Sequence, residues 1–215
     1  AYIAPADVSG TIMQAGHTEN GTGQITVDGG STVEMAKGSN PNETQSGPHV
    51  GVGKVNGSNG TLTVTGTGSA INMEAGGSAA SFQIGRNGGT GTVSVNNGGA
   101  INMVDSSAVS GSGWISGDGI QVGRGSGGVG TLNVESGSVR VESTSGGYVQ
   151  IGREGGTGTV NVTGTGAFSV IDTDAGSSGP GASITIGRDL NGNGRLDPGE
   201  PLIARTRADT AGLAN

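Results

Sequence analysis

Apolar residues recur along this chain in short runs in which every second position is apolar and the intervening one is polar or glycine. Such alternation places successive side chains on opposite faces of an extended strand, one face buried and one solvated. Three sets of runs align with one another. The first set comprises Ile25/Val27, Leu62/Val64, Val93/Val95, Leu132/Val134 and Val160/Val162. The second comprises Val33/Met35, Ile71/Met73, Ile101/Met103, Val139/Val141 and Phe168/Val170. The third comprises Val50/Val52, Phe82/Ile84, Ile120/Val122, Val149/Ile151 and Ile184/Ile186.

Each run of the third set ends in a marker, an apolar residue followed by glycine and a basic residue. The markers are Val52-Gly53-Lys54, Ile84-Gly85-Arg86, Val122-Gly123-Arg124, Ile151-Gly152-Arg153 and Ile186-Gly187-Arg188, with a degenerate copy at Ala15-Gly16-His17. The basic positions are separated by 37, 32, 38, 29 and 35 residues. Constant flanks with unequal spacing predict fixed strands joined by loops of variable length.

Three short strands per repeat, each in register with its counterpart in the next repeat, describe a coil wound around a narrow apolar core. The sequence therefore predicts an all-β fold, a β-solenoid of about five coils, of which the right-handed form is the commoner. We expect an N-terminal segment over residues 1–12, which is a partial cap or an inter-subunit strand. The solenoid follows over 13–188, then a calcium-binding loop over 189–200 and a tail over 201–215.

Composition agrees with a tube rather than a thick globular core. The chain has 48 glycines among 215 residues, and only 2% of its residues are aromatic. The net charge of −7 argues against nucleic acid or an anionic membrane as a partner. No apolar run is long enough to insert into a membrane. The chain starts at Ala1 without methionine, as removal of a signal peptide leaves it, so we expect a secreted, extracellular protein.

Two runs carry a resemblance to a known class of repeat. Residues 85–95 read Gly-Arg-Asn-Gly-Gly-Thr-Gly-Thr-Val-Ser-Val, and residues 152–162 read Gly-Arg-Glu-Gly-Gly-Thr-Gly-Thr-Val-Asn-Val. Both resemble the autotransporter-associated β-strand repeats of bacterial passenger domains, and the resemblance covers roughly residues 12–188. It implies a right-handed β-helical surface protein, and most such passengers are adhesins or stalks.

Residues 189–200 match the calcium-binding loop of EF-hand proteins at each constrained position. Oxygen-bearing residues stand at positions one, three, five, nine and twelve, and Gly194 stands at six, where the loop turns sharply. The predicted ligands are Asp189, Asn191, Asn193, Arg195 through its carbonyl, Asp197 and a bidentate Glu200. A strand rather than a helix leads into this loop, so we expect a solitary structural calcium site.

Weaker signals leave alternatives open. The basic marker residues should stack in a column, which could bind an anionic glycan. We favour the interpretation that each one caps corner carbonyls or pairs with a neighbouring acid, since like charges so close repel one another. Asp172 and Asp174 could form a carboxylate pair for glycoside cleavage, but their loop is glycine-rich and no aromatic platform lies near.

These features give three hypotheses for function. The first is a secreted structural subunit that binds copies of itself head to tail in a calcium-stabilised fibre, because no sequence reads as a cap for either end. The second is a cell-surface adhesin or stalk segment. A polysaccharide lyase or hydrolase is the third and the least favoured, so we expect no catalytic activity.

Overall fold

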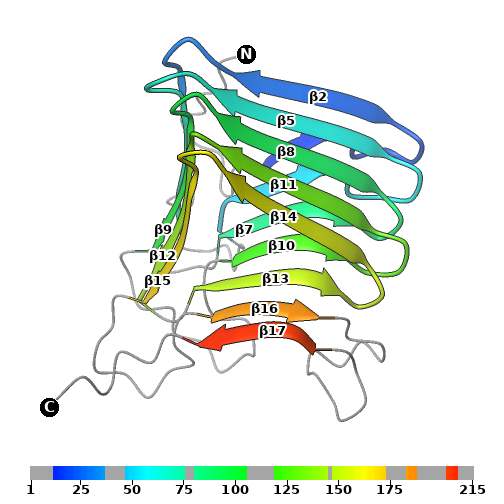
Figure 1. Cartoon of the computed structure of the whole chain (residues 1–215). Coiled ribbons are helices and arrows are strands. Elements are labelled where there is room, and N and C mark those ends of the chain that lie inside the picture. Colours follow the sequence, from blue (N-terminus) through cyan, green and yellow to red (C-terminus); the bar gives the residue numbers. More distant parts are fainter. Residues whose placement is uncertain are drawn as a thin grey trace, which may run out of the picture.

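The computed structural model describes residues 12–36, 47–75, 80–105, 119–144, 147–172, 183–187 and 202–207. These residues form seventeen strands in three sheets, and the chain visits the sheets in turn as it winds (Figure 1). Within them, no helix is long and apolar enough to cross a membrane. The predicted all-β solenoid of about five coils is confirmed.

The three sheets are named here in the order in which the chain enters them. Sheet A contains β1 (Ile12–Ala15), β4 (His49–Val52), β7 (Ser81–Arg86), β10 (Gly119–Arg124), β13 (Tyr148–Arg153), β16 (Ser183–Gly187) and β17 (Leu202–Arg207). Sheet B contains β2 (Thr22–Val27), β5 (Asn59–Thr65), β8 (Thr90–Asn96), β11 (Val129–Glu135) and β14 (Thr157–Thr163). Sheet C contains β3 (Thr32–Ala36), β6 (Ala70–Glu74), β9 (Ala100–Asp105), β12 (Ser138–Ser143) and β15 (Ala167–Asp172).

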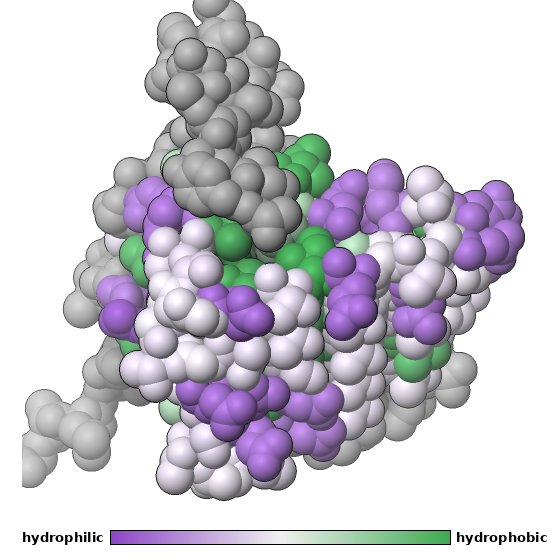
Figure 2. All heavy atoms as spheres, turned by 90° about the horizontal axis from the view of Figure 1, so that it is seen from above, coloured by the Kyte–Doolittle hydropathy of each residue, from purple (hydrophilic) through white to green (hydrophobic). Residues whose placement is uncertain are grey.

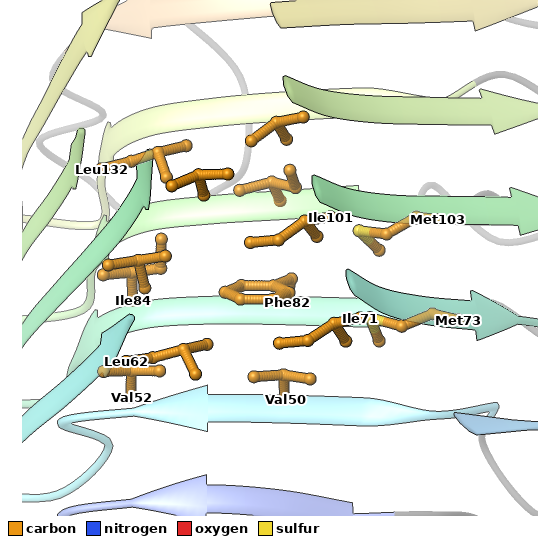
Figure 3. Close-up of a cluster of buried hydrophobic side chains, with 14 of the residues drawn as sticks. Val50, Val52, Leu62, Ile71, Met73, Phe82, Ile84, Ile101, Met103 and Leu132 are labelled. Carbon is orange, nitrogen blue, oxygen red and sulfur yellow. The ribbon is translucent and has the colours of Figure 1, made fainter. Parts of the chain in front are cut away.

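Each of the first thirteen strands pairs in parallel with the strand three places later in the chain. The registers place the predicted apolar sets in columns: Phe82 stacks between Val50 and Ile120, and Met73 between Met35 and Met103. These side chains point into one lumen, where Phe82 is 1% exposed (Figure 3). Alternation along each strand thus builds the core, because every second residue meets its counterpart in the next coil.

The corner between sheets A and B requires glycine at the second position of the marker. The backbone of Gly85 has a φ of +66°, a left-handed conformation that favours glycine. A Cβ on Gly85 would lie 1.9 Å from the carbonyl oxygen of Val129 in the next coil. Gly91, at the start of β8, has the same constraint, since its Cβ would lie 2.1 Å from the carbonyl oxygen of Val52. Close backbone approach therefore explains why the marker repeats.

The variable loops all join sheet C to sheet A. They comprise residues 37–48, 75–80, 106–118, 144–147 and 173–182. The connections at the other two corners are shorter and more uniform. The unequal spacing of the markers therefore arises at one corner of the coil.

Sheet A ends differently from the other two. The last strand, β17, pairs with β16 in the antiparallel direction, whereas every other pair among the described strands is parallel. Residues 202–207 lie within 201–215, for which the sequence predicts only a tail. Because β16 and β17 extend sheet A beyond β13, sheets B and C end two strands before sheet A does, at β14 and β15 (Figure 1).

Candidate functional sites

The predicted calcium ligands Asp189 to Glu200 lie outside the described residues, as does Arg188 at the end of the basic column. Their position in the chain is still informative: residues 189–200 fall in the connection between β16 and β17, which pair with each other. Among the residues that the structure describes, no group of three or more His, Asp or Glu side chains could hold a metal ion.

The basic marker residues form a column at the edge of sheet A. The registers place Arg124 between Arg86 and Arg153. Each arginine donates a hydrogen bond to the glutamine three residues before it: Arg86 Nη1 to Gln83, Arg124 Nη1 to Gln121 and Arg153 Nη1 to Gln150, at 2.7 to 3.0 Å. The sequence did not predict this second column of glutamines, whose amides also bond from coil to coil.

Two glutamines of this column, Gln83 and Gln121, are buried although they lie on the outer face of sheet A. Gln121 is 2% exposed, and its Oε1 accepts a bond from Gln83 Nε2 at 3.3 Å. Its own amide nitrogen donates to the hydroxyl of Tyr148 at 3.4 Å. Tyr148 therefore has a structural partner in this column.

Glu154 neutralises the C-terminal half of the basic column. Its carboxylate accepts bonds from Arg124 Nε and Nη2 at 2.9 and 3.2 Å. Arg153 Nε lies 3.0 Å from the same carboxylate, in an ion pair whose geometry is not that of a hydrogen bond. Glu154 has a φ of +54°, which costs a non-glycine residue about 1 kcal/mol. For these two arginines, pairing with an acid is confirmed.

The N-terminal half of the column is not neutralised in this way. Within the described residues, no carboxylate lies within ion-pair distance of Lys54 or Arg86. Arg86 Nε is buried and has no hydrogen-bond partner there, and the same holds for Nε2 of the neighbouring His49. This end of the column is therefore a concentration of positive charge on a protein whose net charge is −7.

The pKa values of His49, Lys54 and Arg86 are all lowered, which is the direction that burial and like charge predict. Burial lowers the pKa of His49 from 6.5 to about 4, with further contributions from Lys54, Arg86 and His17. Burial and Arg86 also lower the pKa of Lys54. Burial and Arg124 lower the pKa of Arg86, although Glu154 acts in the opposite direction. Burial is thus the largest cause of each of the three shifts, and neighbouring positive charges add to it.

The two ends of the lumen form the second candidate site. Figure 2 looks onto the N-terminal end, where apolar residues gather at the centre inside a ring of more polar ones. At the C-terminal end, the last strand of sheet B leaves part of the lumen exposed, as the five valines of one column show. Val27, Val64, Val95 and Val134 are between 0% and 4% exposed, whereas Val162 in β14 is 44% exposed. Val160, Phe168 and Val170 of the last coil are only partly buried.

The candidate carboxylate pair is not brought together in the part of the chain that the structure describes. Asp172 is the last residue of β15, and Asp174 lies outside the described residues.

Comparisons with family models, with curated proteins and with solved structures found no match to this chain. The fold therefore defines the class, a β-solenoid with three parallel sheets of five coil strands each, and function must be argued from its surfaces.

Proposed function

We propose that this protein is a secreted structural subunit that assembles head to tail into a calcium-stabilised extracellular fibre. The observation that supports this most directly is the rise in exposure along one column, from 0% at Val134 to 44% at Val162. Inside the molecule such valines are covered by the next coil. The first coil of a second copy is the surface that best matches the exposed last coil.

The strand edges support the same proposal. Among the described strands, β14 and β15 have a neighbour on one side only, and so do β1, β2 and β3 at the other end. Such edges present rows of unpaired backbone groups that can bond to another chain. An end-to-end contact uses two different surfaces, so it does not close and continues as a filament.

The unequal ends suggest how the junction is filled. When β1 of a second copy meets β17, sheets B and C leave a recess about two strands deep, roughly 10 Å. Residues 1–11 of that copy directly precede β1 in the chain, the place that a strand of sheet C holds before β4, β7, β10 and β13. We assign them to this recess as an inter-subunit strand beside β15.

Calcium has a specific place in this proposal. Ligation by residues 189–200 would tie β16 to β17 and so hold the strand at the junction in position. Calorimetry should give one saturable calcium site, and Glu200→Gln should weaken it by roughly tenfold or more, since it removes a bidentate ligand. Glu135→Gln, in β11, is the matched control. Neither heat nor a rise in melting temperature on adding calcium would contradict the calcium site.

Electron microscopy of purified protein tests the fibre. We expect filaments with calcium, shorter or fewer filaments with a chelator, and monomers after deletion of residues 1–11. Monodisperse monomers of the intact protein both with and without calcium would defeat the proposal. Filaments that survive the deletion unchanged would remove the inter-subunit strand and leave the end-to-end contact.

A second candidate, a surface adhesin, is favoured by one observation, the uncompensated positive end of the basic column. Acidic glycans are the partners that such a surface would attract. This candidate does not exclude the first, because the column lies on a side of the solenoid and not at its ends.

A further inference from the structure

The glutamine column on sheet A is interrupted at one coil. In register, its positions are occupied by Gln14, Gly51, Gln83, Gln121 and Gln150. A Cβ on Gly51 would lie 3.3 Å from Lys54 Cδ, 3.4 Å from His49 Nε2 and 3.6 Å from Gln14 Cγ. Two basic side chains therefore border the space that a glutamine side chain would fill.

This part of the column contains nitrogen atoms without hydrogen-bond partners in the part of the chain that the structure describes. Each of the three described arginines of the column bonds to a glutamine three residues earlier, but Lys54 has Gly51 at that place. His49 Nε2 and Arg86 Nε are buried with no hydrogen-bond partner among the described residues. Buried donors without partners are rare, because losing water without gaining another bond is costly. The arrangement lacks an acceptor.

The missing acceptor should carry negative charge. Lys54 and Arg86 stand on adjacent coils, about 4.8 Å apart along the column. Glu154 pairs with Arg124 and Arg153, which lie two and three coils away from Lys54. Two cations at this spacing repel each other, and a shared oxyanion would convert the repulsion into two charge-assisted hydrogen bonds.

We propose that His49, Lys54 and Arg86 form a binding site for an oxyanion, a sulfate or carboxylate group. Lys54 and Arg86 supply the charge, and neutral His49 donates a hydrogen bond through Nε2. Gly51 is part of the site because the absence of its side chain leaves the space. The inference stands apart from fibre formation, and it specifies the ligand chemistry of the second candidate.

The site can be filled from within the protein. Gly51→Gln would extend the amide column and give Lys54 an acceptor. The φ of Gly51 is open to other residues, and the atoms nearest to its Cβ belong to flexible side chains that can give way. We expect Gly51→Gln to abolish anion binding while the protein stays folded by circular dichroism. Lys54→Gln should weaken binding by roughly tenfold.

The measurement is a titration of the His49 ring signals by NMR, with sodium sulfate against sodium chloride at equal ionic strength. We expect a saturable change with sulfate, accompanied by a rise in the pKa of His49. Arg140→Gln, which removes an arginine from sheet C, is the matched control and should change the sulfate Kd by less than about twofold, because its long-range effect is screened.

Two further probes separate the sources of such a group. A sulfated tetrasaccharide that binds roughly tenfold or more tighter than sulfate would identify a glycan as the ligand. Equal affinities would identify a free anion, and binding of glucuronate alone would restrict the site to carboxylates. The proposal is overturned if none of the probes saturates, or if Gly51→Gln binds them as the unmodified protein does.

Discussion

At the scale of single residues, Gly85 combines a left-handed φ with a close approach to the backbone of Val129. Gly29 has a similar φ of +62°, but nothing lies within 4 Å of its Cβ position. We expect Gly85→Ala to lower the free energy of unfolding by about 3 kcal/mol or more, and Gly29→Ala by about 1 kcal/mol. Urea denaturation measures both. Equal losses would mean that conformation alone, and not the approach of the next coil, requires the marker glycine.

His49 makes stability depend on pH in a defined window. Its pKa is about 4 in the folded protein, below the ordinary 6.5, because of burial first and then the neighbouring charges of Lys54, Arg86 and His17. As pH falls below 6.5 the unfolded chain gains a proton at His49 that the folded protein does not bind until about pH 4. The free energy of unfolding should therefore fall by up to about 3 kcal/mol across this window.

The test of that dependence compares variants, since carboxylates titrate in the same range. Denaturation of His49→Gln between pH 7 and pH 4 should show a smaller loss of stability than the unmodified protein. His17→Gln is the control, because that side chain is exposed and its charge is the smallest of the contributions to the pKa of His49. Identical pH profiles for all three proteins would show that His49 is not the group responsible.

The residues of the anion site illustrate what the sequence could not show. The basic column was predicted from the repeating markers, but its unequal neutralisation depends on Glu154, which pairs with Arg124 of the preceding coil as well as with the adjacent Arg153. Gly51 is visible in the sequence as an exception in the third set. That this exception leaves a space in the glutamine column is known only from the register, which places Gly51 beside Gln83 and close to the Lys54 side chain.

At the scale of elements, the parallel strands could be predicted because each one repeats. An i, i+2 pattern that recurs at matching places fixes both the buried face and the partner, so all three sets of apolar pairs were found. Strand β17 has no counterpart in the repeats, and its antiparallel pairing with β16 follows from a chain reversal that no periodicity marks. The same reasoning explains why the glutamine column was not predicted, since the outer face of sheet A carries no apolar signal.

Identical changes in different strands should have different costs. Val95 in β8 is fully buried between two coils, whereas Val162 in β14 belongs to the same column and is 44% exposed. We expect Val95→Ala to lower the free energy of unfolding by about 2 kcal/mol, and Val162→Ala by less than about 1 kcal/mol. If the two substitutions cost the same in monomeric protein, another part of the chain covers the last coil.

At the scale of the whole molecule, a solenoid interacts mainly with its next coil, so its ends are the places where an identical interaction is left unmade. The described ends are unlike each other: one is level, and the other carries β16 and β17 beyond its neighbours. Unlike ends favour one polarity of stacking over the reverse, which is the property that a fibre subunit needs.

Two exposed valines offer a direct test of that polarity. Val162 and Val129 are 44% and 41% exposed, but Val162 lies in the last strand of sheet B, in the column of lumen valines, while Val129 starts β11, which has a neighbour on each side. Lysine at position 162 would place a charge inside an end-to-end junction, where it loses water without gaining a partner. Lysine at position 129 would stay in solvent.

Val162→Lys should therefore abolish filaments and leave a folded monomer by analytical ultracentrifugation, whereas Val129→Lys should assemble normally. Equal assembly of the two variants would mean that the open coil is not the junction, and equal loss would point to the side of the solenoid instead.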